Sequence, residues 1–385
     1  MTVPSICLAA GEVSGDLHGA ALARALRRRW PDARLWGLGG PRMAAEGVDL
    51  LADLERLAVM GFAEVVRHLP YFLGLLSRVG RAIDERRPDL VVPIDYPGFN
   101  LRLAAAAHRR GVPVLYYIAP QVWAWKRGRV RQLARHADRV AVILPFEAND
   151  LGAEGVAAEF VGHPLLHDRP ALPDRAAFCA ALGLDPARPL LALLPGSREQ
   201  ELARHLELFV AAGRRAASSV DAQLVIARAH GLHGSAFARS EVPTTDDAWG
   251  LLGHARAALV KSGTGTLQAA IAGVPMVVAY RTSALTFALA RRVVRVPWVS
   301  LVNLVAGAPV VREFVQGEAT EEAIGPALER ALAEGPEREA MIAALAQVRE
   351  ALSAPGGGDP SERVAAIAAE LLAAGADPEP GGATR

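Results

Sequence analysis

Two corners of the sequence combine residue types that can bind a phosphate. At the first, Pro195–Arg198, an apolar run ends and a polar, acidic stretch begins, which is typical of a buried strand followed by a helix. An arginine can donate two parallel hydrogen bonds to a phosphate, and the N–H groups that open a helix favour an anion. The corner therefore predicts an anion site, unless Arg198 only pairs with Glu201 or Glu207 on its own helix.

The second corner, Ser262–Thr266, has the same strand-to-helix pattern in the same half of the chain. Its two glycines let the backbone approach a ligand closely, and its hydroxyls can bond a phosphate at the start of a helix expected from about Thr266. Gln268, in the first turn of that helix, can bond a ribose hydroxyl. The pattern is not a Walker loop, since Lys261 precedes the glycines, and capping of an ordinary turn by Ser and Thr is the alternative. Two such corners on one sheet suit a diphosphate.

A carboxylate at the end of an apolar strand, Asp95 in the segment 93–100, is a candidate general base. Partial burial at such a position raises the pKa of a carboxyl group towards the range in which it accepts a proton near neutral pH. The alternative is that Asp95 only caps the helix expected after Asn100.

The glycine-rich segment 10–19 is a third strand-to-helix connection, but its chemistry differs. Glu12 and Asp16 would repel a phosphate, whereas carboxylates bond well to sugar hydroxyls, so the segment predicts a sugar site. Helix capping by Ser14 and Asp16 is the structural alternative.

Aromatic and basic residues alternate in the segment 116–139. Gln121, Trp123 and Trp125 can line a pocket, and the basic run from Lys126 can meet a phosphorylated ligand, an anionic membrane or water. The same pattern can bind single-stranded nucleic acid. A formal net charge of +1 gives no global basic field, however, so no nucleic-acid partner is expected.

Residues 57–83 carry an apolar helical stripe flanked by arginines. An amphipathic, basic surface of this kind can lie on a membrane, although such a stripe more often faces a core. Pro70 divides the segment into two expected helices.

The composition is that of a globular protein with more than one domain. The chain has 385 residues, of which 51% are hydrophobic and 22% charged. Its two cysteines, Cys7 and Cys179, lie far apart and favour a reducing compartment without a disulfide. No Cys/His cluster has metal-ligand spacing, so neither a metal nor a cofactor is expected.

Short apolar runs closed by Gly or Pro alternate with amphipathic stretches, which predicts parallel sheets covered on both faces. The expected strands are 5–10, 33–40, 89–95, 113–120, 139–146, 189–197, 222–229, 257–266 and 274–281. The predicted fold is α/β, with two Rossmann-like doubly wound domains facing across a cleft and ligands at the carboxyl ends of the strands. The expected boundaries are 1–165 for the first domain, 166–185 for a linker, 186–350 for the second domain, 360–375 for a helix that packs on the first half, and 376–385 for a disordered tail.

Seven motifs occur in this order along the chain: AGEVSGDLHGA, PIDYPGFN, APQVWAW, FVGHPL, LLPGSREQEL, SGTGTLQAA and SLVNLVAG. Together they resemble the lipid-A-disaccharide synthases, a family of inverting glycosyltransferases with the two-Rossmann architecture called GT-B. The resemblance covers about residues 5–350. It implies that UDP-2,3-diacylglucosamine condenses with 2,3-diacylglucosamine 1-phosphate to give the β-1,6-linked disaccharide of lipid A, with release of UDP and without a metal.

The resemblance also implies roles for the residues described above. Asp95 matches the base that deprotonates the 6-hydroxyl of the acceptor. The acceptor side of the site would be formed by Glu12, Ser14, Asp16, Gln121 and Trp123. UDP would be held by Gly196, Ser197, Arg198, Ser262, Gly263, Thr264, Gly265, Thr266, Gln268 and Asn303.

One motif departs from the family pattern. Where members usually read S-G-T-A-T-L-E, this chain has Gly265 and Gln268, and a glutamine bonds a ribose hydroxyl more weakly than a carboxylate does.

Both substrates named by the resemblance carry acyl chains. It therefore implies a peripheral protein on the cytoplasmic face of the inner membrane, in contact through about residues 57–83, and it also suggests a homodimer. The rival functions are another UDP-sugar transferase of the same architecture, a UDP-sugar epimerase, a sugar-nucleotide-binding protein without turnover, and a module that binds membrane or nucleic acid.

Overall fold

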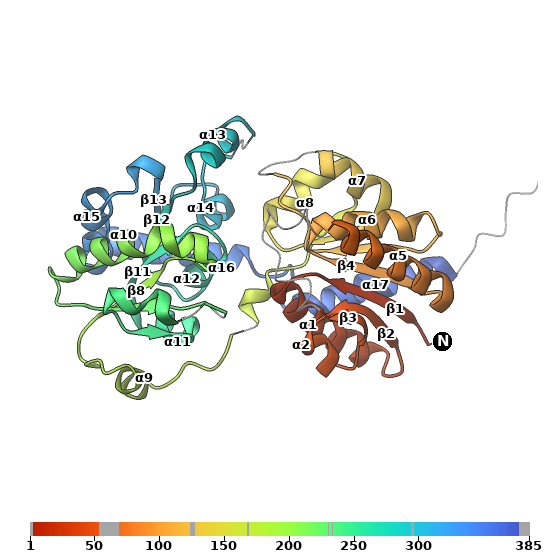
Figure 1. Cartoon of the computed structure of the whole chain (residues 1–385), viewed down its shortest axis with the longest axis horizontal. Coiled ribbons are helices and arrows are strands. Elements are labelled where there is room, and N and C mark those ends of the chain that lie inside the picture. Colours follow the sequence, from red (N-terminus) through yellow and green to blue (C-terminus); the bar gives the residue numbers. More distant parts are fainter. Residues whose placement is uncertain are drawn as a thin grey trace, which may run out of the picture. The chain divides into compact units, whose positions relative to one another are not determined.

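The chain divides into two compact units. Unit 1 comprises Met1–Pro164 and Ser353–Arg385, and unit 2 comprises Leu165–Leu352. Each unit is an α/β domain with a parallel sheet of its own (Figure 1). The computed structural model describes residues 3–53, 69–123, 128–167, 169–229, 231–232, 234–293 and 296–376.

The described part of unit 1 forms a seven-stranded parallel sheet in the order β3-β2-β1-β4-β5-β6-β7. Its strands are β1 (Ser5–Ala10), β2 (Arg34–Gly39), β3 (Asp49–Asp53), β4 (Leu90–Ile94), β5 (Leu115–Tyr117), β6 (Arg139–Val142) and β7 (Ala158–Phe160). Its helices are α1 (Val13–Arg29), α2 (Pro41–Ala45), α5 (Leu69–Arg86), α6 (Pro97–His108), α7 (Gly128–His136), α8 (Pro145–Gly152) and α17 (Pro360–Ala376).

The described part of unit 2 forms a six-stranded parallel sheet in the order β10-β9-β8-β11-β12-β13. Its strands are β8 (Leu190–Leu194), β9 (Gln223–Ala227), β10 (Thr244–Thr245), β11 (Ala255–Lys261), β12 (Met276–Tyr280) and β13 (Arg312–Val315). Its α-helices are α9 (Arg175–Ala181), α10 (Glu199–Ala217), α11 (Ala248–His254), α12 (Thr264–Ile271), α13 (Ala284–Val293), α14 (Leu301–Ala306), α15 (Glu321–Leu332) and α16 (Pro336–Ala351). Short 3-10 turns occur at η1 (Pro164–Leu166), η2 (Gly234–Ala236), η3 (Ala238–Ser240) and η4 (Gln316–Glu318).

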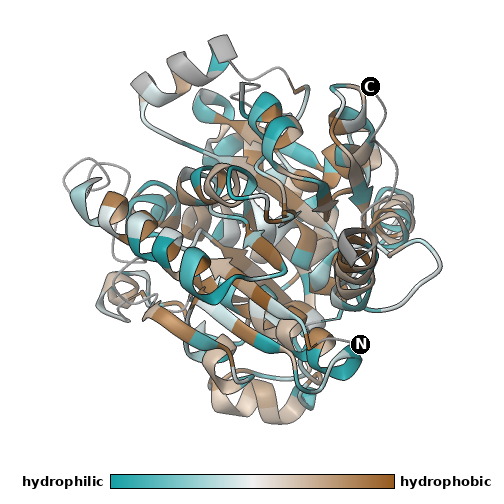
Figure 2. Cartoon of the chain, turned by 90° about the vertical axis from the view of Figure 1, so that its right-hand side faces the viewer, coloured by the Kyte–Doolittle hydropathy of each residue, from teal (hydrophilic) through white to brown (hydrophobic). Residues whose placement is uncertain are grey.

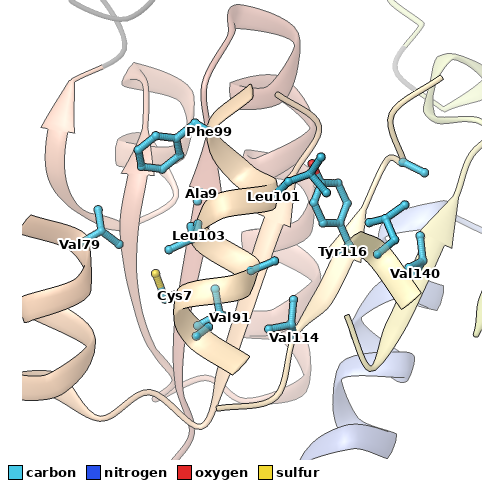
Figure 3. Packing of buried hydrophobic residues seen from close by; sticks show 14 of the residues in the cluster. Cys7, Ala9, Val79, Val91, Phe99, Leu101, Leu103, Val114, Tyr116 and Val140 are labelled. Atoms are coloured by element: carbon cyan, nitrogen blue, oxygen red, sulfur yellow. The ribbon is translucent and has the colours of Figure 1, made fainter. Parts of the chain in front are cut away.

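The central strands are buried on both faces because their side chains point alternately into two apolar layers. In β1, Cys7 and Ala9 pack in a layer with α5 and α6, whereas Ile6 and Leu8 pack in a layer with α1 and α17. Figure 3 shows the first layer, with Leu103 of α6 over the strands. In Figure 2 the strands are mainly brown, and the helices around them carry both brown and teal residues.

The last described helix, α17, completes the second of these layers. It contacts α1, β4 and β5, and its Val364 and Ile367 are fully buried in the same cluster as the apolar side of α1. Unit 1 is therefore built from both ends of the chain, and Figure 1 shows the blue α17 among its red and yellow elements.

Each sheet has one point at which the strand order reverses. It lies between β1 and β4 in unit 1 and between β8 and β11 in unit 2. In open parallel sheets such a switch point leaves a crevice beyond the carboxyl ends of the two strands, and ligands bind there. The connections that follow β1, β4, β8 and β11 are the four on which the sequence analysis placed its strongest candidate residues.

Several elements differ from the expectation. Helix α1 begins at Val13, so most of the glycine-rich segment 10–19 is helical, and α12 begins at Thr264, two residues early. Asn100 lies inside α6. The segment expected as a linker, 166–185, contains α9 and falls in unit 2.

The tail predicted to be disordered, 376–385, lies outside the described residues except for Ala376, the last residue of α17. Within the described ranges, no helix has the length and apolar character that crossing a bilayer requires.

Candidate active site

The corner after β8 presents an arginine to solvent. Gly196 has a φ of +133°, a backbone conformation that favours glycine, and Arg198 is the N-cap residue of α10. The Arg198 side chain is exposed, and its guanidinium has no hydrogen-bond or ion-pair partner among the residues that the structure describes. Glu201, the alternative partner considered from the sequence, instead bonds Lys261 at 2.8 Å. Arg198 therefore remains available to an anion.

The corner after β11 uses two of its three hydroxyls internally. Ser262 donates to the Val299 carbonyl at 2.5 Å, and Thr266 donates to the Gly263 carbonyl at 2.7 Å. Thr264 is exposed at the first position of α12, and Gly263 before it has a φ of +146°. The groups that can meet a ligand here are thus Thr264 and the opening N–H groups of α12, with Gln268 one turn further along.

Asn303, expected at the UDP site, forms hydrogen bonds within unit 2. Its side chain is fully buried, donates to the Val311 carbonyl and to Glu313, and accepts from the Val311 N–H, each within 2.9 Å. Glu313 also accepts from the N–H groups of Val299 and Ser300. Since Ser262 bonds the Val299 carbonyl, Asn303 and Glu313 hold the segment that supports the second corner.

A cavity of about 580 Å³ in unit 2 lies beside β13 and is lined by Asn303, Glu313 and residues of α15 and α16. Residues 196–198 and 262–268 do not line it. We place the candidate site at the two corners because their charge and backbone geometry suit an anion, whereas the cavity pairs acidic with basic side chains.

In unit 1, Asp95 follows β4 in a strained backbone. Asp95 and Tyr96 have φ values of +48° and +45°, which non-glycine residues rarely adopt. The strain is held by hydrogen bonds: the Asp95 N–H donates to the Tyr117 carbonyl, and the Asp95 carbonyl accepts from the Tyr116 hydroxyl and the Asn100 amide, each at 2.8–2.9 Å. Strain of this kind gathers at functional sites.

The Asp95 carboxyl group is electrostatically unusual. Burial raises its pKa to about 6, the negative charge of Glu12 adds to the rise, and the Tyr96 N–H opposes it. A carboxyl group with this pKa can accept a proton and release it near neutral pH.

The end of β1 meets the end of β4 at this point. A Cβ on Gly11 would come within 2.1 Å of the Tyr96 ring, so only glycine permits the two connections to touch. Glu12 is the exposed N-cap residue of α1, and Ser14 is exposed in its first turn.

Asp16 points elsewhere. It is buried and accepts from the N–H groups of Gly40, Arg42 and Met43, at 2.8–3.1 Å. Gly40 is the N-cap residue of α2 and has no side chain, so Asp16 of α1 supplies the missing cap. The structure thus gives Asp16 to the fold and leaves Glu12 and Ser14 for a ligand.

The connection after β5 carries Gln121 and Trp123. Gln121 is exposed, and Trp123 donates its indole N–H to Glu147 of α8 at 3.0 Å and packs its ring edge against Phe146. Trp125, Lys126 and Arg127, also named from the sequence, lie outside the described residues.

Glu147 is a residue that the sequence analysis missed. It is 3% exposed, and this burial raises its pKa to about 7. The negative charge of Asp95 adds to the rise, and the hydrogen bonds from Trp123 and the Leu144 N–H oppose it. Its signal was available, since Glu147 directly follows the strand expected at 139–146, and Asp95 is the last residue of the strand expected at 89–95.

Most of the described part of the apolar stripe faces the core. Val79 and Ile83 of α5 are buried, and Phe72 and Leu76 are partly buried against the same cluster. These four residues of the stripe therefore pack on the core, while 57–68 lie outside the described residues. Leu73, which also belongs to the stripe, is 53% exposed.

Comparisons with known proteins bear on both the fold and the family. A glycotransferase of kitacinnamycin aligns with 97% of this chain and 100% of its own at a TM-score of 0.64 and 18% identity. A putative UDP-N-acetylglucosamine 2-epimerase from Listeria monocytogenes aligns with 98% of each chain at a TM-score of 0.63 and 13% identity. The fold is therefore the two-domain Rossmann-like architecture of GT-B glycosyltransferases, and it does not separate a transferase from an epimerase.

The sequence relatives distinguish a transferase from an epimerase. Lipid-A-disaccharide synthase of Acidobacterium capsulatum is 43% identical over 96% of this chain and 97% of the relative. The synthase of Myxococcus xanthus is 40% identical over 97% of this chain and 98% of the relative. The model of the lipid-A-disaccharide synthetase family matches residues 6–354. A chain with these two sheets, these corners and these relatives belongs to the lipid-A-disaccharide synthetase family, the glycosyltransferases of lipid A biosynthesis.

Proposed function

We propose that this chain transfers a 2,3-diacylglucosaminyl group from UDP-2,3-diacylglucosamine to 2,3-diacylglucosamine 1-phosphate. The products are the β-1,6-linked disaccharide 1-phosphate and UDP. The observation that carries the proposal is Asp95, a partly buried carboxylate with a pKa of about 6 at the switch point of unit 1, in a chain of this family.

In the proposed reaction unit 2 holds UDP. Arg198 donates to the diphosphate, the opening N–H groups of α12 and the Thr264 hydroxyl donate beside it, and Gln268 bonds the ribose. Gly196 and Gly263 let the backbone come close, whereas Ser262, Thr266 and Asn303 support the second corner from behind.

In the proposed reaction unit 1 holds the acceptor sugar. Glu12, Ser14, Gln121 and Trp123 form its surroundings, and Asp95 takes the proton of the 6-hydroxyl. The hydroxyl oxygen then forms a bond to the anomeric carbon of the donor while the bond from that carbon to the diphosphate oxygen breaks. UDP leaves with the electron pair, and the configuration at that carbon inverts. Arg198 and the N–H groups stabilise the charge that gathers on the leaving diphosphate.

The test is acceptor-dependent release of UDP by the purified protein. UDP should appear when UDP-2,3-diacylglucosamine and 2,3-diacylglucosamine 1-phosphate are both present, and should not appear with either alone. Arg198→Ala should weaken UDP binding, and Asp95→Asn should leave UDP binding unchanged while lowering turnover by about 10²–10⁴-fold. Tight UDP binding without acceptor-dependent release would contradict the transferase and favour a sugar-nucleotide-binding protein.

We further propose that unit 1 contacts the cytoplasmic face of the inner membrane through the region of about 57–83. The acyl chains of the substrates, the exposed Leu73 and the neighbouring exposed Arg78 and Arg81 support this. Leu73→Glu should reduce sedimentation with anionic vesicles, and Leu172→Glu, at a leucine of unit 2 that is 57% exposed, should not. Equal sedimentation of both variants with wild type would remove α5 from the contact.

A further inference from the structure

Lys261 stands out in a chain that uses arginine for nearly every basic position. Lys126 and Lys261 are its only lysines among 42 basic residues. An ammonium is a compact charge with three donors and suits a crowded site that a planar guanidinium does not. Lys261 is the last residue of β11, directly before the second corner at the switch point of unit 2.

The Lys261 ammonium is held between the two corners. It donates to Glu201 at 2.8 Å, and the side chains of the pair are only 16% and 18% exposed. The second oxygen of Glu201 accepts from the Ser197 N–H at 3.0 Å, so one carboxylate connects Lys261 to the first corner. On the other side, the ammonium is 3.6 Å from the position that a Cβ on Gly263 would occupy, which brings it to the second corner.

A third connection fixes Glu201 from its backbone. His205 of α10 lies within 2.7 Å of the Glu201 carbonyl through Nδ1 and accepts from the Arg281 N–H at 2.8 Å through Nε2. Because Nε2 accepts, the ring proton is on Nδ1 and the imidazole is neutral. His205 thus ties α10 to the end of β12 without bringing a positive charge.

The two corners have few positive charges to balance those of a bound diphosphate. Arg198 supplies one positive charge, and that of Lys261 is neutralised by Glu201. The diphosphate of a UDP-sugar carries more than one negative charge. It gains another when its bond to the transferred sugar breaks. Within the described residues, Glu201 is the one hydrogen-bond acceptor of the ammonium, which leaves its other two donors for phosphate oxygens.

We propose that Lys261 is the second cation of the diphosphate site, with Glu201 as the group that holds it between the corners. The inference deepens the proposed function and rests on it. A phosphate oxygen bound between Ser197 and Gly263 would accept from the ammonium while Glu201 keeps its bond on the other side. The same contact would strengthen as the diphosphate leaves.

The test compares the binding of UDP and of uridine by calorimetry. Lys261→Met should bind UDP about 10- to 100-fold more weakly, since a charge-assisted hydrogen bond is lost, and should bind uridine as wild type does. Glu201→Gln keeps an acceptor for the Ser197 N–H but holds the ammonium less firmly, so it should bind UDP more weakly than wild type, with a smaller loss than Lys261→Met. Arg188→Met, which breaks the pair with Asp221 before β8, removes the same charge from the opposite edge of the sheet and should have no effect.

Two results would overturn the inference. One is wild-type affinity of Lys261→Met for UDP. The other is an equal loss in Lys261→Met, Glu201→Gln and the double variant, which would make the pair a structural clamp. If Lys261→Met does not fold, Lys261→Gln keeps a hydrogen bond to Glu201, loses the charge and should show the same loss. Failure of the wild type to bind UDP would instead overturn the nucleotide site of the proposed function itself.

Discussion

At the scale of single residues, carboxyl groups have different roles because their surroundings differ. Asp16 and Glu201 accept hydrogen bonds from backbone N–H groups, whereas burial raises the pKa of Asp95 to about 6 beside Glu12. Among the carboxyl groups that the structure describes, Asp95 combines a raised pKa with a position at a switch point, and this combination supports its proposed role as the base.

The first prediction concerns pH. A base must be deprotonated, so kcat/KM should fall about tenfold per pH unit below about pH 6 and level off above it. Glu12→Gln removes a negative charge that raises the pKa of Asp95, so the acidic limb should move to lower pH. The measurement is the pH at which kcat/KM begins to fall, obtained from initial rates of UDP release. The maximum value of kcat/KM is not used, since it also reflects acceptor binding. If the pH at which kcat/KM falls did not change, the charge of Glu12 would have no effect on the pKa of the catalytic base.

The second prediction concerns stability. The pKa of Asp95 in the folded chain, about 6, lies above its ordinary 3.8. The folded state therefore favours the protonated carboxyl, and the stabilisation present below pH 3.8 is lost as the pH rises through 6. Asn imitates the protonated form, so Asp95→Asn should be more stable than wild type by about 2–3 kcal/mol at pH 8. The difference in free energy of unfolding between the variant and wild type, measured from the transition of unit 1 in chemical denaturation of the full chain, should shrink towards pH 4. A difference that did not change with pH would be due to packing instead.

At the scale of elements, one helix caps another. The N–H groups that open α2 have no capping side chain of their own at Gly40, and Asp16 of α1 accepts from them. Position and orientation of α2 against α1 thus depend on one carboxylate.

This gives the third prediction. Asp16→Ala should destabilise unit 1 by about 1–2 kcal/mol, because a buried cap is lost. Ser14→Ala, an exposed position two residues earlier in α1, should change stability by less than about 0.5 kcal/mol. Thermal unfolding of both variants checks this. Normal stability of Asp16→Ala together with a raised KM for the acceptor would return Asp16 to the sugar site.

The elements also show what the sequence could predict. Central strands such as β4 and β8 are buried at every residue and read as continuous apolar runs, so they were expected near their observed positions. The four strands that were not expected, β3, β7, β10 and β13, are the two edges of each sheet. Edge strands are short and half exposed, so their sequences carry polar residues and lack an apolar run.

The candidate site divides in the same way. Asp95 and Arg198 could be named from the sequence because a polar residue directly after a buried strand must lie at the carboxyl edge of the sheet. Asp16 and Asn303 have partners, Gly40 and Glu313, that only the folded chain brings near. The bonds of Glu147 and Lys261, to Trp123 and Glu201, also span 24 and 60 residues, so no local pattern indicates them.

At the scale of the whole molecule, unit 1 needs the end of the chain. Val364 and Ile367 of α17 are fully buried against the layer that covers β1 and β4. Burial of two such side chains contributes on the order of 3–6 kcal/mol, comparable with the total stability of many domains.

The fourth prediction follows from this. A chain that ends at Ala354 should lose the protection of β1 and β4 against hydrogen exchange, while β8 and β11 keep theirs, because α17 packs within unit 1. Calorimetry should still detect UDP binding by unit 2. Full protection of β1 and β4 in the shortened chain would show that α17 is dispensable.

The division of unit 1 between the two ends of the chain also sets an order for its biosynthesis. From Phe160, the end of β7, to Pro360, the start of α17, the ribosome must add 200 residues. At about 5–20 residues per second this takes on the order of 10–40 s, during which the part of the first sheet that α17 covers stays exposed. Unit 2 begins later and is complete earlier. A nascent chain therefore exposes part of the apolar face of its first domain until translation is almost finished. A truncated messenger RNA would yield a polypeptide that keeps this apolar surface exposed, and chaperones and proteases would recognise it.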